Sequence, residues 1–445
     1  MSGSTRQHRA AAAIAAAAAA AVHAPAIGGS FVNWDDPRYV LRNELARAPA
    51  DHGLVEWLTT PDIGYPIPLT VAAYSAQRAA FRDPDARFGV DPRGFHAVSV
   101  ALHAIVAALA VAFALRLGAT PAGAALGASL FAVHPVTVEP VAWVTGQKDL
   151  LAAVCCLAAL TIRAGPRGGD RRRSAACGLL AIAALAAKPS AVGILPALWL
   201  VDRARRRPLR SRRAAALYGA LTAAVAADIA LSLAGHRSHG VSPLADFGVT
   251  SLAHAGWSYA LQLLHVVWPT HLAARYVPPT GWALVGWALA GAGLAAATAA
   301  AAAWLWRTRS RAAGLAIAAA GLAYLPAGGI LPLPRGPADS YAYLPLAITA
   351  AAVALGVGRA LAATAGAERA AVAAAAVVAV ATAATTTRGQ IPVWRDSIAL
   401  WSHAVAIYPD RPQLAMRLGE AYLFEGQPDR AARLFDAIES RYRGF

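Results

Sequence analysis

Two adjacent carboxylates, Asp35 and Asp36, follow the first apolar segment within the stretch FVNWDDPRYV, residues 31–40. Two acids side by side repel each other, so one can carry a raised pKa and act as a base while the other stays ionised. The same Asp-Asp-Pro sequence also suits a solvated turn before Pro37. General-base chemistry and a simple turn are therefore both open on the local sequence.

Other side chains with chemical potential lie where apolar runs end. The carboxylate, imidazole and hydroxyl side chains of this kind are those of His134, Glu139, Asp149, Asp339 and Tyr341. The cations are Lys148, Lys188, Arg275 and Arg335. The scattered histidines lack clean metal-ligand spacing, and the sequence leaves a metal undecided.

The composition indicates a polytopic helical membrane protein. Of 445 residues, 58% are hydrophobic and only 14% are charged, with a mean hydropathy of +0.46. The net charge of +16 comes from arginines in short loops between apolar runs, which is a topology signal and argues against nucleic-acid binding. Cys155, Cys156 and Cys177 sit in apolar stretches and are expected to be packing residues.

The order of the apolar runs predicts an all-α fold with about eleven transmembrane helices. Residues 1–27 form a signal anchor that becomes the first helix, and 28–93 form an outer loop that carries the acidic pair. Residues 94–390 form the membrane domain, in which 251–268 is expected to be re-entrant or interfacial so that Arg307, Arg309 and Arg311 stay inside. The N-terminus is predicted to be cytoplasmic and the C-terminus extracytoplasmic.

Two further segments carry structural expectations. In the outer loop, four aromatic residues are expected to rest at the lipid interface on an amphipathic helix: Trp57, Tyr65, Tyr74 and Phe81. The tail, residues 391–445, is charged and helical, and six residues fall at positions of a tetratricopeptide repeat: Leu418, Gly419, Tyr422, Gly426, Ala431 and Phe435. A tail of one and a half repeats buries little core, so it is expected to dock on the membrane domain or on a partner.

Five sequence blocks resemble a known family. They are FVNWDDPRYV at 31–40, HPVTVEPVAWVTGQKDLL at 134–151, AAKPSAVGILPALWLVD at 186–202, ADSYAYLP at 338–345 and VWRDSIALWSHAVAIYP at 393–409. In this order they resemble the membrane proteins with tetratricopeptide repeats that are related to the transmembrane O-mannosyltransferases, members of the C-type glycosyltransferase superfamily. The resemblance extends over nearly the whole chain.

The resemblance implies a glycosyltransferase that uses a polyprenyl-phosphate sugar, with mannose as one candidate sugar, and a protein or glycan acceptor. It implies that Asp35 and Asp36 occupy the acidic pair of the first outer loop, with Asp35 as general base. It implies that the cations Lys148, Lys188 and Arg275 are candidates to neutralise the donor phosphate, and that the five polar side chains named above shape the pocket or hold the acceptor. It leaves a divalent metal open. The family usually has arginine directly after the aspartate represented here by Asp339, whereas this chain has Ser340; Arg335 is a replacement candidate. The heavy use of alanine and arginine suggests a bacterial inner membrane.

Two other functions compete with this interpretation. In the first, the chain is a non-catalytic membrane scaffold whose tail recruits an envelope partner, as Ser340 and the short repeat array would suggest. In the second, it is a transporter with discontinuous helices, for which Lys188-Pro189 and Asp228 are the only hints. A transporter of that kind is expected to be built from repeated halves, and no internal repeat is evident.

Overall fold

The described part of the chain consists of helices and connecting loops. The computed structural model describes residues 2–61, 64–167, 169–208, 210–238, 247–330 and 336–442. Within these ranges the only strand-like pairing is an isolated bridge between Arg82 and Val90. The prediction of an all-α polytopic membrane protein is confirmed.

The helices of the first half alternate between long apolar elements and short polar ones. Their bounds are α1 (Ser2–His23), α2 (Glu44–Arg47), α3 (Leu54–Thr59), α4 (Pro68–Ala80), α5 (Pro92–Arg116), α6 (Pro121–Ala132), α7 (Val138–Ala142), α8 (Gln147–Ala164), α9 (Arg171–Ala187) and α10 (Ile194–Ala204). Short 3-10 or π turns join several of them: η1 (Ala24–Gly28), η2 (Pro37–Leu41), η3 (Pro49–Asp51), η4 (Pro135–Thr137), η5 (Val144–Gly146) and η6 (Pro189–Gly193).

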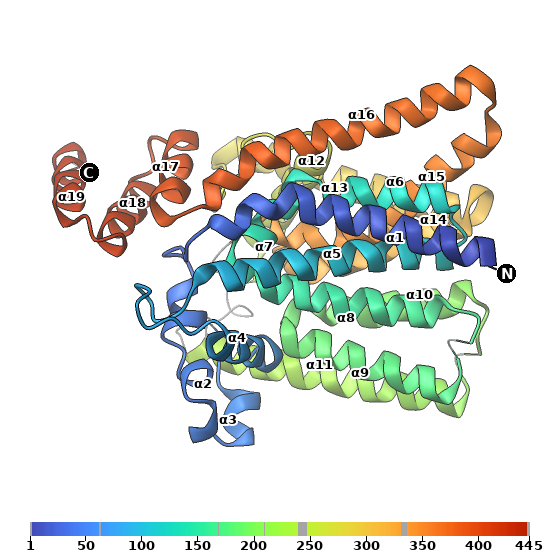
Figure 1. Cartoon of the computed structure of the whole chain (residues 1–445), viewed down its shortest axis with the longest axis horizontal. Coiled ribbons are helices and arrows are strands. Elements are labelled where there is room, and N and C mark those ends of the chain that lie inside the picture. The colour runs from blue at the N-terminus through green and yellow to red at the C-terminus, as the bar shows by residue number, and fades with distance from the viewer. Residues whose placement is uncertain are drawn as a thin grey trace.

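The second half adds longer helices and the C-terminal tail. Their bounds are α11 (Arg212–Ser238), α12 (Val249–Val267), α13 (Gly281–Trp304), α14 (Arg311–Tyr324), α15 (Ser340–Ala363), α16 (Gly366–Gln390), α17 (Ser397–Ile407), α18 (Pro412–Phe424) and α19 (Pro428–Tyr442). The turns are η7 (Leu305–Arg309), η8 (Leu325–Ala327) and η9 (Ile391–Trp394). Figure 1 shows the long helices running side by side, with the two chain termini at opposite ends.

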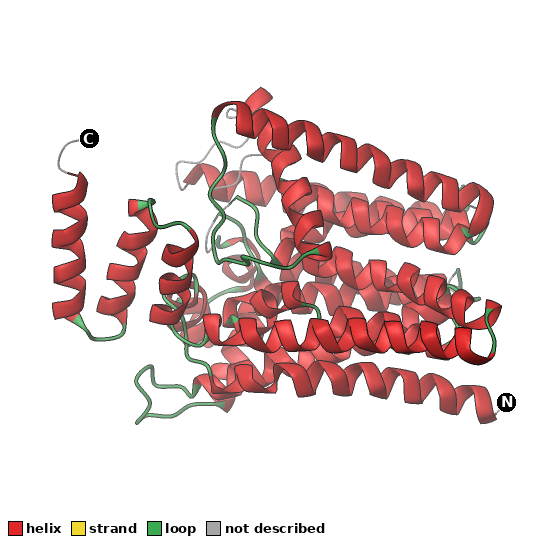
Figure 2. Ribbon diagram, turned by 90° about the horizontal axis from the view of Figure 1, so that it is seen from above, coloured by secondary structure: helices red, strands yellow, loops and turns green. Residues whose placement is uncertain are grey.

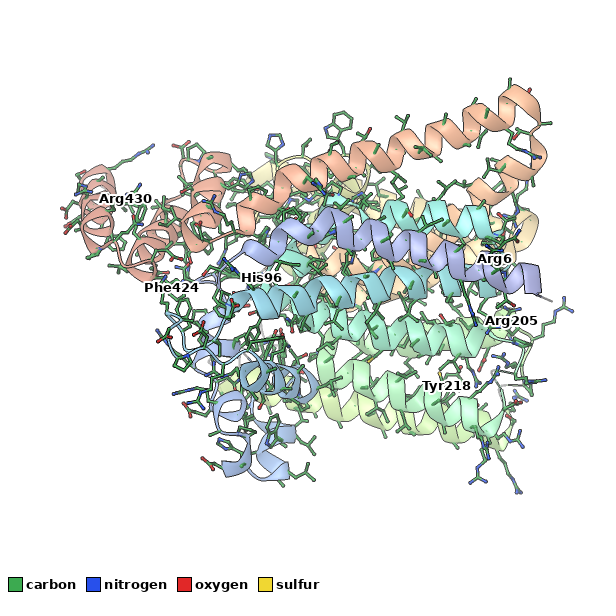
Figure 3. All side chains as sticks on the ribbon, in the orientation of Figure 1. Arg6, His96, Arg205, Tyr218, Phe424 and Arg430 are labelled. Atoms are coloured by element: carbon green, nitrogen blue, oxygen red, sulfur yellow. The ribbon has the colours of Figure 1, made fainter. Side chains whose placement is uncertain are left out.

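The two ends of the bundle differ in charge. Figure 3 shows Arg6 and Arg205 at the end that holds the N-terminus, which we call the basic end. The Arg205 guanidinium donates to the Arg116 carbonyl there. The opposite end holds the acidic loop and the tail, and we call it the site end. Arginine-rich loops favour the cytoplasmic side of a membrane, and which side each end faces stays a prediction.

Fewer helices reach the length of a full span than the predicted eleven. Among the described residues, seven helices are long and apolar enough to cross a membrane, or eight if the bent pair Pro121–Ala132 and Pro135–Ala142 counts as one. Three predicted spans fall on the shorter helices α9, α10 and α14. They pack within the same bundle, α9 against α8 and α10 against α14.

The segment expected to be re-entrant forms α12, which is not among the seven long spans. Arg359 near the end of α15 donates to Ser310 at 2.8 Å, beside the arginines of η7. Gly358 of the same helix lies against Thr120, which follows Arg116 of the basic end by one short turn. The arginines that motivated the prediction therefore lie at the basic end with the others.

Tryptophans lie near both ends of the exposed helix α13. Trp282 is 88% exposed and Trp304 is 53% exposed in the isolated protein. At the helical rise per residue, they are about 33 Å apart along the helix, close to the hydrocarbon thickness of a bilayer. Indole rings favour the two interfaces of a membrane. The Arg309 guanidinium lies 5.9 Å from the Trp304 ring centroid, as expected where the helix meets water.

Small residues allow close packing inside the bundle, as the alanine-rich and glycine-rich composition suggests. On α6, Gly123 and Gly127 form a GxxxG pattern that faces α15. A Cβ atom on Gly127 would lie 2.7 Å from the Ala354 nitrogen, and one on Gly123 would lie 2.4 Å from the Ala354 carbonyl oxygen. Backbone atoms cannot move aside like a side chain, so these contacts admit only glycine.

We expect Gly127→Ala to destabilise the protein by about 1–3 kcal/mol, because the added methyl group overpacks the helix interface. The measurement is the apparent unfolding temperature in detergent. Gly293→Ala on α13 is the matched control, since nothing lies within 4 Å of the position of its added Cβ. An equal unfolding temperature for Gly127→Ala and wild type would contradict the close contact.

The tail leaves the bundle at the site end and folds into three short helices, α17 to α19, as Figure 2 shows from above. In the α18–α19 hairpin, Gly419 lies against Phe435, and Gly426 adopts a φ of 72° in the turn. The structure shows a helical hairpin here, and the tetratricopeptide repeat stays a prediction. The tail was expected to dock on the membrane domain or on a partner. In the structure α17 packs on the first outer loop, and α18 contributes Leu414 and Leu418 to a buried cluster that also holds Val138, Ala142 and Trp143 of the membrane domain.

Candidate active site

The two adjacent aspartates point to different partners. Asp36 is fully buried, and its carboxylate accepts hydrogen bonds from Val32 N at 2.9 Å, Thr145 N at 3.0 Å and Thr145 Oγ1 at 2.5 Å. It thereby ties the outer loop to the turn between α7 and α8. Asp35 is partly exposed. Side chains of neighbouring residues in an irregular loop point in different directions. Asp36 therefore holds the loop in place, while Asp35 stays accessible to solvent.

Burial sets the protonation of Asp36. Removal from water raises its pKa from 3.8 to about 6, against the opposing effect of the three hydrogen bonds, while the charge of Asp35 adds a small increase. Because the unfolded group ionises near pH 3.9, the folded protein holds this proton more tightly between about pH 4 and 6. The contribution of Asp36 to stability is therefore largest below about pH 4, falls as the pH rises to about 6, and is constant above that.

We expect Asp36→Asn to destabilise the protein by about 1–3 kcal/mol at low pH, because its amide cannot accept from both Val32 and Thr145. The deficit relative to wild type is expected to shrink by about 2 kcal/mol between pH 4.5 and 6.5, as wild-type Asp36 ionises. Unfolding temperatures of both proteins in detergent at the two pH values measure the difference. A deficit that does not change with pH would contradict the titration of Asp36 in this range.

Asp35 lies opposite a buried cation. Its Oδ2 is 3.8 Å from the Lys148 Nζ, and the Asp35 side chain is 24% exposed whereas that of Lys148 is 4% exposed. The same ammonium lies 4.8 Å from the Tyr39 ring and 4.7 Å from the Trp143 ring, in cation–π geometry. The site thus places a solvent-accessible carboxylate beside a desolvated ammonium held between two aromatic faces.

Asp149, the residue after Lys148 on α8, belongs to a second charged group with Lys188 and Tyr341. Asp149 pairs with Lys188, and the Lys188 Nζ lies 5.0 Å from the Tyr341 ring centroid. Both charged side chains are buried. A pocket opens beside this pair, with Ser190 and Ser340 among its polar lining and a largely apolar remainder: Ala152, Ala191, Ala323, Ala327, Leu344 and Pro345. In the described part of the chain, Asp149 Oδ2 and Ser340 Oγ have no hydrogen-bond partner.

Two of the remaining candidates are bonded to each other. Glu139 accepts from the Asp339 backbone N–H at 3.2 Å, and Asp339 Oδ1 accepts from the Tyr276 hydroxyl at 2.6 Å. The His265 ring nitrogen lies 3.4 Å from the same carboxylate. His134 Nε2 contacts the Val266 carbonyl at 3.0 Å. All of these side chains are buried, so here they fasten the loop before α15 to α7 and α12.

Of the two arginines predicted to bind the donor phosphate, Arg275 lies within the described residues. Arg275 is half-buried and lies between Ala274, which belongs to the cluster around Trp143, and Tyr276, which bonds Asp339. Arg335 lies outside the described residues. Asp228 lies on α11, and in the described part of the chain its Oδ2 has no hydrogen-bond partner.

Some site residues escaped the sequence interpretation. Tyr74 was expected at the lipid interface, but it is fully buried and donates to the Val144 carbonyl at 3.2 Å, so that prediction is wrong for Tyr74. Tyr65 is only half-buried, and burial, followed by the charges of Tyr341, Asp35 and Asp149, raises its pKa. Its hydroxyl is therefore close enough to Asp35 and Asp149 for both charges to act on it. Nothing in the sequence indicated that Tyr65 belongs to the site, apart from its place in the proline-containing stretch GYPIPL, residues 64–69.

A divalent metal finds no ready set of ligands. In the ranges that the structure describes, no three His, Cys, Asp or Glu side chains cluster as metal ligands do. Asp36 is engaged by Thr145 and Val32, and Asp35 faces an ammonium. The described residues do not fit a resident metal. Cys155, Cys156 and Cys177 are buried and free, as predicted for packing residues.

All five sequence blocks of the family resemblance meet at the site end. Block 134–151 is central, because Thr145 bonds Asp36 of block 31–40 and Asp149 pairs with Lys188 of block 186–202. Glu139 of the same block accepts from block 338–345, and the Trp143 ring lies 5.8 Å from that of Trp394 in block 393–409. Segments separated by up to 360 residues thus surround one group of charges.

The chain is similar to two Drosophila melanogaster proteins. It is 38% identical over 123 residues to the protein O-mannosyl-transferase Tmtc2, and 35% identical over 115 residues to the protein O-mannosyl-transferase Tmtc1. Each match covers 26% of this chain and 13% of the relative, so the matched part is a small share of those longer proteins. No protein-family model matches the sequence. The similarity relates the chain to glycosyltransferases in general.

Proposed function

We propose that this protein is an inverting membrane glycosyltransferase that moves a sugar from a polyprenyl-phosphate carrier to a hydroxyl acceptor at the site end. The observation that carries the proposal is the accessible Asp35 carboxylate 3.8 Å from the buried Lys148 ammonium, beside the Lys188 pocket. The similarity to protein O-mannosyl-transferases supports the same reaction class. Mannose is the sugar, and a serine or threonine hydroxyl the acceptor, that those names suggest.

In the proposed reaction, the acceptor oxygen attacks the anomeric carbon while the bond from that carbon to the phosphate oxygen breaks. The acceptor proton passes to Asp35, and the bonding electron pair leaves with the polyprenyl phosphate. Lys148 and Lys188 neutralise the charge that builds on the departing phosphate.

Lys188 also supplies a positive charge in place of the arginine that the family usually has at the position of Ser340. Ser340 begins α15 and lines the same pocket as Lys188, so the cation expected at position 340 is supplied instead by Lys188, the residue before η6. On this proposal Arg335 is not needed for the phosphate. The site end would face outward, on the periplasmic side of a bacterial inner membrane, because the arginine-rich basic end faces the cytoplasm.

The test is transfer of radiolabelled sugar from defined polyprenyl-phosphate sugars to hydroxyl-containing peptides, in membranes that contain the protein. Labelled peptide above the level of membranes without the protein, with inverted anomeric configuration, is the expected result. Absence of transfer from every donor, with folding verified, would overturn the proposal. It would favour the scaffold function, for which the specific observation is Ser340 in place of the family arginine.

A further inference from the structure

The first helix of the tail, α17, packs directly on the loop that carries Asp35. Ser30 N donates to the Arg395 carbonyl at 2.8 Å, and Asn33 N donates to Ser397 Oγ at 3.1 Å. In return, the Trp401 indole N–H donates to Asn33 Oδ1 at 2.7 Å. Three hydrogen bonds therefore join residues 30–33 to a segment more than 360 positions later, immediately before the acidic pair.

Aromatic contacts strengthen the same junction. The Trp34 ring lies 5.0 Å from the Trp401 ring in edge-to-face geometry, and the Arg417 guanidinium of α18 lies 5.7 Å from the Trp34 ring. Trp401 and Ser397 are fully buried, whereas most of the tail surface is exposed. A buried indole needs a hydrogen-bond partner for its N–H, and Trp401 has one in Asn33 as well as close ring packing on Trp34, so the junction is a rigid joint.

The loop is thus held on two opposite sides of Asp35. On one side Asp36 is fixed by Thr145 and Val32. On the other, Asn33 is fixed by Trp401 and Ser397. Only one freely accessible carboxylate remains between these anchors, and its position relative to Lys148 depends on both of them.

We infer that α17 is a positioning element of the candidate site, with Trp401 and Asn33 as positioning residues that hold Asp35 opposite Lys148. The tail is therefore part of the transferase and not only a recruitment module. This inference rests on the proposed function for its kinetic consequences, but the geometry can be tested without activity. A displacement of about 1 Å of a catalytic group is enough to lower a rate by two orders of magnitude.

The kinetic test compares four variants in the sugar-transfer assay. Trp401→Ala is expected to lower kcat at least tenfold with the donor KM within twofold, because binding groups stay in place. Trp401→Phe keeps the ring but loses the N–H, and a two- to fivefold loss is expected. Two control variants remove other ion pairs of the tail. Glu425→Gln breaks the 2.6 Å pair between Glu425 of the tail and Arg87 of the outer loop, and Arg441→Ala breaks the exposed pair with Asp410. Both controls are expected to keep kcat within twofold of the wild type.

The geometric test needs no turnover. Asp35→Cys and Lys148→Cys are introduced together, and the rate of joining by a short thiol-to-thiol crosslinker is measured by mass spectrometry. The three native cysteines are buried and serve as internal background. Addition of Trp401→Ala is expected to slow crosslinking at least fivefold, whereas Arg441→Ala is expected to leave the rate unchanged.

The two proposals fail in distinguishable ways. No transfer by the wild type, together with crosslinking slowed by Trp401→Ala, would overturn the proposed reaction and support the positioning role. Transfer by the wild type, together with a crosslinking rate that Trp401→Ala does not change, would overturn the positioning role alone. A fall in kcat equally large for Glu425→Gln would also overturn it, since the effect would then belong to tail docking in general.

Discussion

Asp35→Asn is expected to lower sugar transfer by roughly 10²- to 10⁴-fold, because the acceptor hydroxyl then has no base to take its proton. The protein is expected to fold with some loss of stability, because the buried Lys148 ammonium loses the carboxylate 3.8 Å away. The measurement is the initial rate of transfer at saturating donor, normalised to folded protein.

Two variants sharpen the assignment. Asp35→Glu keeps a carboxylate about one bond further along, and a partial recovery of rate is expected because a base is again present but displaced. Asp85→Asn removes an exposed carboxylate from the same outer loop, and no change is expected. Retention of wild-type transfer by Asp35→Asn would remove the general base from this position. Asp36→Asn is a different experiment, since Asp36 is a buried anchor whose loss acts through stability.

Lys188→Met is expected to lower transfer by about 10²- to 10³-fold and also to destabilise the protein. The loss of transfer follows because a preorganised cation no longer meets the departing phosphate. The loss of stability, on the order of 3–5 kcal/mol, follows because Asp149 is left buried without its partner. Transfer rates and unfolding temperatures are measured on the same preparations.

The double variant Lys188→Met with Asp149→Asn separates the two effects. Replacing both charges is expected to recover most of the stability while transfer stays low, because the cation is still absent. Arg163→Met is the matched control at the basic end, where Arg163 and Asp202 form another buried pair at 2.5 Å. It is expected to cost stability without changing transfer per folded molecule. Recovery of transfer in the double variant would show that Lys188 serves only to neutralise Asp149.

The sequence by itself determined the class of the protein and the residue types at its site. Long alanine-rich apolar runs with arginines in short loops specify a helical membrane protein, because each run must satisfy its own backbone in lipid. The number of full spans was less certain. The helices α9, α10 and α14 have 17, 11 and 14 residues, fewer than the about 20 that a full span needs. The acidic pair was visible as two adjacent aspartates, and the boundary positions of Lys148 and Lys188 were visible as well.

Only the tertiary structure decided what each of these residues does. Adjacent aspartates have the same local sequence, and the backbone path sends Asp36 to Thr145 and leaves Asp35 beside Lys148. The partners of Lys188 and Asn33 are 39 and 368 positions away along the chain. Such pairings are fixed by helix packing and loop closure, which no local pattern records. The physical reason is that burial and charge neighbourhood, which set pKa and accessibility, belong to the folded assembly and not to the sequence segment.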